Sequence, residues 1–65
     1  MNAAAEKLAY TIPHFAEAVD LSVSTVYGAI NSDELVPVYP AKRKPLITLE
    51  EGLRWLRSLP DVRPA

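Results

Sequence analysis

The sequence predicts one mainly α-helical domain with a small β-hairpin, in the order helix, turn, helix, hairpin, helix. Two short amphipathic segments, residues 11–19 and 22–31, are separated by a break too short for another element. Residues 35–48 follow as two β-leaning arms around a charged tip, which is typical of a hairpin. A third amphipathic segment, residues 49–58, ends before Pro60.

Chain length and composition restrict the class of protein. The 65 residues suffice for one domain, and their 49% hydrophobic content favours a packed core over disorder. Because the chain has no cysteine, neither disulfides nor a thiolate zinc site can support it. No apolar run reaches membrane-spanning length and no signal segment is visible. We therefore expect a small soluble protein of a reducing cytoplasm, without a membrane partner.

The first helix has a clear start. Thr11 is a candidate N-cap, and Pro13 stands just inside it, where a missing N–H costs nothing. Four residues at helical spacing are predicted to form its buried face: Ile12, Phe15, Ala16 and Val19. We interpret residues 1–9 as a flexible N-terminal tail and residues 10–59 as the domain.

The second helix follows a break at Asp20 and Leu21, with Ser22 as its predicted N-cap. Its inward face is predicted to be Val23, Val26, Tyr27 and Ile30. Two helices joined by so short a turn form the helix-turn-helix pattern, whose second helix lies in a DNA major groove. A plain αα-hairpin in a small helical domain is the alternative.

The hairpin is predicted from Leu35–Pro40 and Pro45–Thr48, with Ala41–Lys44 as its tip. Two prolines restrict the first arm to an edge position, which a two-stranded ribbon allows.

The third helix is predicted to begin with a capping box. Thr48 would cap it, and Glu51 would reach back to the N–H of the cap residue. Arg54 and Arg57 are expected on its solvated face. Its apolar face is predicted to be Leu49, Leu53 and Leu56, with Trp55 and Leu59 beside it. Residues 60–65 are interpreted as a C-terminal tail. The complete order of elements is that of a winged helix-turn-helix.

Charge is distributed unevenly along the chain. The net charge is −1 and the isoelectric point about 5.7, which by themselves argue against nucleic-acid binding. Residues 1–34, however, sum to −4 and residues 35–65 to +3. Three of the cations in the second half are consecutive, so an acidic protein can still present a basic prong: Lys42, Arg43 and Lys44.

Several runs of residues resemble a known family. They are Tyr10-Thr11-Ile12-Pro13, Leu21-Ser22-Val23-Ser24-Thr25-Val26-Tyr27 with Ile30, Glu34-Leu35, Pro45-Leu46-Ile47-Thr48 and Trp55-Leu56. Together they are similar to the MerR-like winged helix-turn-helix domains of the excisionase type, which are small phage and mobile-element proteins. The resemblance covers about residues 10–59. It is more specific to the fold than to the excisionase role, because small transcriptional regulators share the pattern.

The resemblance implies a two-part DNA interface. The second helix would enter the major groove, with Ser22, Ser24, Thr25 and Asn31 on the groove side, Tyr27 between core and phosphate, and Gly28 open to a close approach. The hairpin would reach an adjacent minor groove or the DNA backbone through Lys42, Arg43 and Lys44. Arg43 is the strongest single candidate, since a narrow minor groove attracts arginine.

The sequence departs from the family pattern in informative places. Asp20 and Asp33 stand where the family usually has glycine, and aspartate tolerates a left-handed backbone better than most residues. Val23 and Gly28 stand where the family often has arginine or lysine, so the helix offers no bidentate arginine to guanine. Glycine within a helix costs about 1 kcal/mol against alanine. Gly28 therefore suggests close approach to DNA or to another helix.

Other kinds of site are not indicated. His14 is the only histidine and has no second metal ligand at useful spacing. The sequence shows no nucleophile–base arrangement and no glycine-rich phosphate loop, so we expect no enzymatic activity, cofactor, metal or small-molecule ligand.

The expected function is architectural DNA binding. Through the resemblance we expect an excisionase, or recombination directionality factor. It would bind and bend double-stranded DNA in a bacterial nucleoid, associate with itself along the DNA, and direct a site-specific recombinase such as an integrase. A small phage or bacterial transcriptional regulator is one alternative. A protein-interaction module that uses the winged-helix fold without DNA is another.

Overall fold

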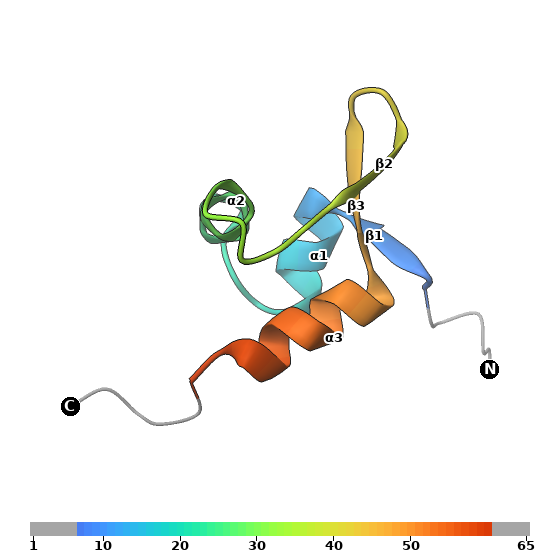
Figure 1. Ribbon diagram of the computed structural model, residues 1–65. Coiled ribbons are helices and arrows are strands. Elements are labelled where there is room, and N and C mark those ends of the chain that lie inside the picture. The colour runs from blue at the N-terminus through green and yellow to red at the C-terminus, as the bar shows by residue number, and fades with distance from the viewer. Residues whose placement is uncertain (1–6, 61–65) are drawn as a thin grey trace.

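The computed structural model describes residues 7–60, a small mixed fold of three helices and a three-stranded antiparallel sheet (Figure 1). The elements in chain order are β1 (Ala9–Thr11), α1 (Ile12–Ala18), α2 (Val23–Asn31), β2 (Val38–Ala41), β3 (Lys44–Thr48) and α3 (Leu49–Ser58). Residues 1–6 and 61–65, most of the two predicted tails, lie outside the described residues. No helix within residues 7–60 has the length and apolar character needed to cross a membrane.

The sheet has one strand more than the predicted hairpin. Its order is β1-β3-β2, and β1 pairs antiparallel with β3 through Ala9 opposite Thr48 and Tyr10 opposite Ile47. The carbonyl of Leu8 also accepts from the N–H of Leu49 at 2.9 Å. Three residues are too few to show a period of two, so only the partner strand reveals β1.

The predicted hairpin is present with a tighter turn. Lys42 and Arg43 alone form the loop, Ala41 and Lys44 are paired, and Lys44 is therefore the first residue of β3. The register shifts between Val38 and Ala41, which marks a bulge in β2. Neither loop residue has a positive φ, so the turn is not of the primed types and the bulge supplies the adjustment.

All three predicted N-caps are confirmed. The hydroxyl oxygen of each cap residue accepts a hydrogen bond from the backbone N–H three residues later. The distances are 3.4 Å from His14 to Thr11, 3.1 Å from Thr25 to Ser22, and 3.1 Å from Glu51 to Thr48.

Both turns at which aspartate replaces the expected glycine are left-handed. Asp20 has φ 62° and Asp33 has φ 63°. Each follows the C-cap of its helix, and the two bonds of a Schellman motif surround it. After α1 these bonds run from Asp20 N to Glu17 O and from Leu21 N to Ala16 O; after α2 they run from Asp33 N to Ile30 O and from Glu34 N to Ala29 O. Aspartate thus occupies a position that glycine occupies at lower conformational cost.

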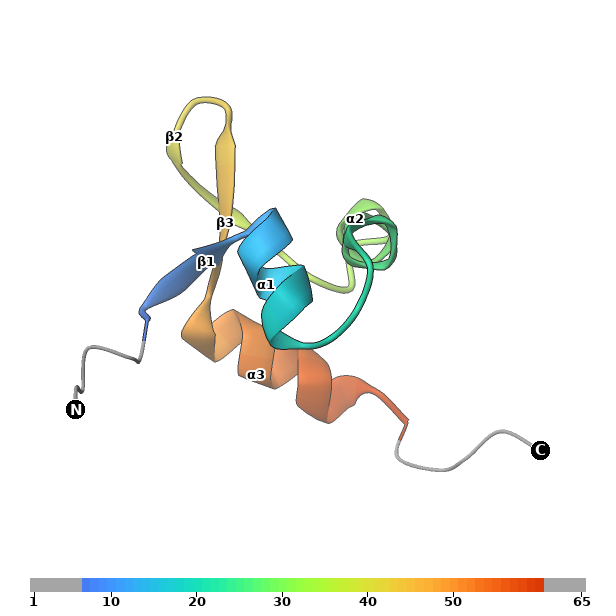
Figure 2. The ribbon, with the colours of Figure 1, turned by 180° about the vertical axis from the view of Figure 1, so that it is seen from behind.

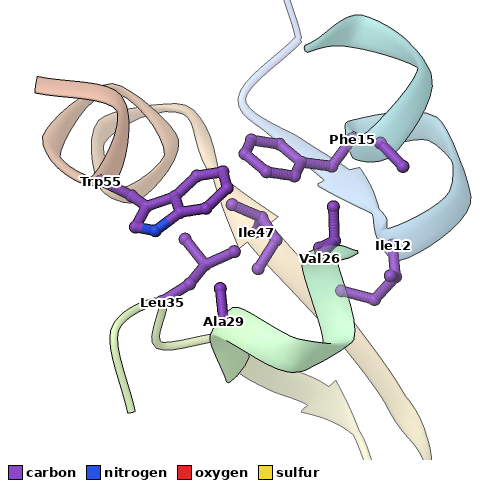
Figure 3. Packing of buried hydrophobic residues seen from close by; sticks show 8 residues of the cluster. Ile12, Phe15, Val26, Ala29, Leu35, Ile47 and Trp55 are labelled. Carbon is purple, nitrogen blue, oxygen red and sulfur yellow. The ribbon is translucent and has the colours of Figure 1, made fainter. Parts of the chain in front are cut away.

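Eight buried hydrophobic residues form the core, and every helix contributes to it (Figure 3). They are Ile12, Phe15 and Ala16 of α1, Val26 and Ala29 of α2, Leu35 of the following loop, Ile47 of β3, and Trp55 of α3. The Phe15 ring lies between two other aromatic rings, 6.4 Å from Tyr10 and 5.9 Å from Trp55 between centroids. The predicted buried face of α1 is confirmed, with Val19 half-buried at its edge.

The predicted inward faces of α2 and α3 were wrong in part. In α2, Val26, Ala29 and Ile30 face the core, whereas Val23 and Tyr27 are 40% and 43% exposed. The packing side of α2 is rotated toward Ala29, which lies beside Leu35 in the core (Figure 3).

In α3 the buried side is Gly52 and Trp55, with Leu59 partly buried, whereas Leu53 and Leu56 are each 39% exposed. The side chain of Phe15 occupies the space beside Gly52, and this contact turns the tryptophan side of the helix inward. The displaced leucines line a shallow groove between α1 and α3 of about 100 Å³, together with Tyr10, Phe15, Ala18, Val19, Leu49 and Gly52.

Candidate nucleic-acid interface

The outward side of α2 carries a continuous uncharged stripe. Ser24, Tyr27, Gly28 and Asn31 are spaced i, i+3, i+4 and i+7, so they share one helix face, and all four are exposed. Val26 and Ala29 lie on the opposite face, in the core. The structure therefore brings four of the six predicted helix residues together on one free surface, hereafter the α2 stripe. Tyr27, left undecided between core and surface, belongs to the surface.

The other two predicted residues, Ser22 and Thr25, form a hydroxyl pair at the start of α2. Their oxygens are 2.8 Å apart, and Ser22 Oγ also accepts from the Thr25 N–H. Whichever hydroxyl donates within the pair, the other keeps its proton for an external acceptor. Exposed N–H groups of the first turn add further donors beside it. This helix end can therefore hold a phosphate oxygen without a charged side chain.

Gly28 has no structural explanation within residues 7–60. A Cβ placed on Gly28 would have nothing within 4 Å. This excludes close approach of another described helix, one of the two explanations that the sequence suggested, and leaves an external one. The fold would accept alanine here and would gain helix stability from it.

The cationic tip consists of Lys42, Arg43 and Lys44, and all three side chains are exposed. Within residues 7–60 the one ion pair joins Glu51 to Arg54, so the tip cations are not neutralised by a described carboxylate. Figure 1 shows the hairpin projecting from the body of the molecule, so its tip can enter a concave surface.

The α2 helix and the hairpin lie on the same side of α3. Both views place them away from α3, with α1 between α2 and the sheet (Figures 1 and 2). Helix α2 packs on α1, and β3 packs on α1 and β1, so α1 is the shared support. The α2 stripe and the cationic tip are thus two separate projections on one core.

Acidic residues lie at both ends of α2. Asp20 precedes its first turn, and Asp33 and Glu34 follow its last. The Glu34 carboxylate accepts from Ser32 Oγ at 3.0 Å, which holds it close to the helix end. Positive potential is therefore concentrated on the hairpin, while α2 offers neutral donors and acceptors. Long-range attraction to a polyanion would come from the tip.

Sequence reasoning missed the partners of Glu51 and Arg54. Glu51 does not complete a capping box: its Oε2 accepts from the backbone N–H of Val36 at 2.9 Å, and its carboxylate pairs with Arg54. Thr48, whose N–H the box would have used, lies opposite Ala9 at the end of β3. Arg54 is not simply solvated, because its Nη2 donates to the carbonyl of Glu34 at 2.7 Å. The Arg54 guanidinium, followed by the Val36 N–H, lowers the pKa of Glu51 from 4.5 to about 2.

Other candidate chemistry is not assembled in the described part of the chain. His14 is exposed, and no group of three or more His, Asp or Glu residues between 7 and 60 is placed to hold a metal ion. Comparisons of the chain with protein-family models, with curated proteins and with solved structures find no match.

Proposed function

We propose that this protein is a DNA-binding winged helix-turn-helix domain that acts as an architectural factor in site-specific recombination, of the excisionase type. In this interpretation the α2 stripe enters a major groove and the hairpin is the wing, which reaches an adjacent minor groove. The resemblance of residues 10–59 to MerR-like excisionase domains supports the assignment, as does the order of the elements.

The observation that carries the proposal is the α2 stripe with Gly28 at its centre. A helix face that is exposed, uncharged and small at one position is suited to close contact with base edges and the sugar–phosphate backbone. The Thr25 methyl group can meet a thymine methyl, and Asn31 can pair with an adenine edge. No described residue requires glycine there, whereas a nearby DNA strand would.

The few positive charges define the expected mode of binding. One module of this size buries about 600–1,000 Å² on DNA. With only three cations at the tip, its affinity alone should fall in the non-specific range, about 10⁻⁴–10⁻⁶ M. Useful occupancy then requires several copies on adjacent sites, and a row of wings inserted into successive minor grooves would bend the DNA.

A transcriptional regulator with the same fold is the nearest alternative. The two functions differ in the arrangement of sites on DNA. A gel shift with DNA flanking the protein's own gene should give a ladder of discrete bands for an excisionase. One complex on a palindromic site would instead favour the regulator.

The decisive experiment tests the wing through the salt dependence of binding. Arg43→Ala should lower the slope of log K against log salt by about 0.9, the value for one phosphate contact. Arg57→Ala is the matched control, because it removes the same charge from an exposed position of α3. If the salt slope changes equally in both variants, or in neither, the wing is not part of the interface.

The groove between α1 and α3 favours a second candidate, protein interaction. Leu53 and Leu56 are exposed there beside Leu49 and Tyr10. Such a surface suits contact between neighbouring copies, or contact with a recombinase. If the protein binds no DNA at low salt and self-associates through these leucines instead, as a Leu53→Ser variant would show by sedimentation, protein interaction is the function.

A further inference from the structure

The connection between the two proposed DNA contacts is a short loop, residues 32–37, that runs from α2 to β2. Two side chains of α3 bind the backbone of this loop on either side of Leu35. Arg54 Nη2 donates to Glu34 O at 2.7 Å, and Val36 N donates to Glu51 Oε2 at 2.9 Å. We call Glu51 and Arg54, with these two backbone groups, the α3 clamp.

The two side chains of the clamp also bind each other. Arg54 Nε donates to Glu51 Oε1 at 2.8 Å, and Arg54 Nη2 donates to Glu51 Oε2 at 2.6 Å, which is a bidentate pair. Glu51 Oε2 and Arg54 Nη2 each also bind the loop, so the position of one side chain depends on the other. The planar fork of arginine allows this arrangement, whereas lysine offers a single charged nitrogen.

The loop joins two elements that share α1 as a support but contact it separately. Helix α2 packs on α1, and the hairpin packs on β1 and α1 through β3. Leu35 is fully buried and fixes one point of the loop in the core. The N–H groups of Glu34 and Leu35 bind Ala29 O and so hold the start of the loop to α2, and the clamp adds a hydrogen bond to α3 on either side of Leu35.

We propose that the α3 clamp is the positioning element of the interface: Glu51 and Arg54 hold the α2-to-β2 loop so that the cationic tip stands at a fixed place relative to the α2 stripe. The role of this geometry in DNA binding rests on the proposed function. Neither residue contacts DNA in this proposal. They act through the loop, and the tip loses its defined position without them.

If only charge mattered, loss of the Glu51 carboxylate would strengthen DNA binding, whereas loss of the clamp should weaken it. The two expectations have opposite signs and can be tested. Glu51→Gln removes a negative charge and should by itself favour a polyanion. Glu50→Gln is the matched control, because it removes the same charge from the same helix turn, and Glu50 is exposed and not part of the clamp. With a fluorescein-labelled random-sequence duplex at low salt, we expect Glu50→Gln to bind as well as the wild type or better. Glu51→Gln should bind about three- to tenfold more weakly. Equal affinities of the two variants would overturn the role in binding.

A second variant separates positioning from general loss of stability. Leu59→Val reduces core packing at the far end of α3, at a residue that is not part of the clamp. Under conditions where all variants are folded, it should keep wild-type affinity. The effect of Arg43→Ala on the salt slope should persist in the Leu59→Val background and shrink in the Glu51→Gln background. If both backgrounds behave alike, the clamp is merely stabilising.

A measurement without DNA keeps the inference independent of the proposed function. The chain has no cysteine, so Asn31→Cys and Lys42→Cys together give two unique sites for spin labels on α2 and the tip. The distance distribution should be narrow with Glu50→Gln and broader with Glu51→Gln. An unchanged width in Glu51→Gln would overturn the clamp. Failure of the wild type to bind any DNA would instead overturn the proposed function and leave this result standing.

Discussion

The two glycines of the chain occupy opposite kinds of environment. Gly52 lies on the inner side of α3, where an added Cβ would stand 2.7 Å from Cε1 of Phe15 and 3.7 Å from Cγ2 of Ile47. Gly28 lies on the outer side of α2, where an added Cβ would meet nothing within 4 Å. Both pay the same intrinsic cost of glycine in a helix. The core explains that cost at Gly52, and the fold offers no reason for it at Gly28.

The comparison separates a residue that the fold needs from one that an external partner would need. Helix α3 is shaped by its contact with Phe15, whereas α2 keeps a small residue at a position where an added Cβ would meet nothing in the described chain. The predictions below test this distinction, beginning with the largest expected effect.

Gly52→Ala should destabilise the protein by about 2 kcal/mol. Overpacking of a core costs about 1–3 kcal/mol, and the better helix propensity of alanine offsets part of it. The Phe15 ring cannot easily yield, because it is 4% exposed and lies between Tyr10 and Trp55. Denaturant unfolding followed by fluorescence of the single, buried Trp55 measures the loss. A variant as stable as the wild type would show that the space beside Gly52 is not limiting.

The α3 clamp, which lies on the same helix as Gly52, makes a contribution to the free energy of unfolding that depends on pH. Since the pKa of Glu51 is lowered to about 2 in the folded protein from an ordinary 4.5, the clamp stabilises fully above pH 4.5 and is lost as the pH falls toward 2. Because the Arg54 side chain is half-exposed, solvent screening keeps this contribution to stability well below what the shift in the pKa of Glu51 alone would imply.

Unfolding free energies measured between pH 7 and pH 2 test the contribution of the clamp. The Glu51→Gln variant should be less stable than the wild type at pH 7, and the difference should close as the pH falls. Glu50→Gln controls for loss of a carboxylate in the same helix turn. A difference that stays constant with pH would mean that the Glu51 carboxylate is not held as described.

Gly28→Ala should separate stability from binding. We expect the free energy of unfolding to rise by about 0.5–1 kcal/mol, because alanine is the better helix former and meets no obstacle. Binding to duplex DNA should weaken, because the added methyl group stands on the surface proposed to approach the strand. Denaturant unfolding and fluorescence anisotropy on the same preparation give both values. Unchanged affinity in the stabilised variant would place the DNA contact elsewhere.

Much of the local structure could be predicted from the sequence because capping interactions span only a few residues. Thr11, Ser22 and Thr48 each bind an N–H three positions away, so the starts of all three helices are visible in the chain. Asp20 and Asp33 likewise mark the two left-handed turns, since each turn is closed by bonds to its own helix. The exposed tip also follows from its sequence position, between two strands of one hairpin.

The tertiary structure alone decided which faces are buried and which distant groups meet. By spacing alone, four exposed residues fit an apolar stripe no worse than the buried ones do: Val23, Tyr27, Leu53 and Leu56. Which residues are buried depends on which neighbouring element fills the space beside them. Strand β1 exists because β3 supplies its hydrogen-bond partner. Glu51 bonds to Val36, fifteen residues away, rather than to its own cap. Local chemistry determined where the elements begin and end, and packing between elements determined how each is turned, because burial is a property of neighbours rather than of spacing.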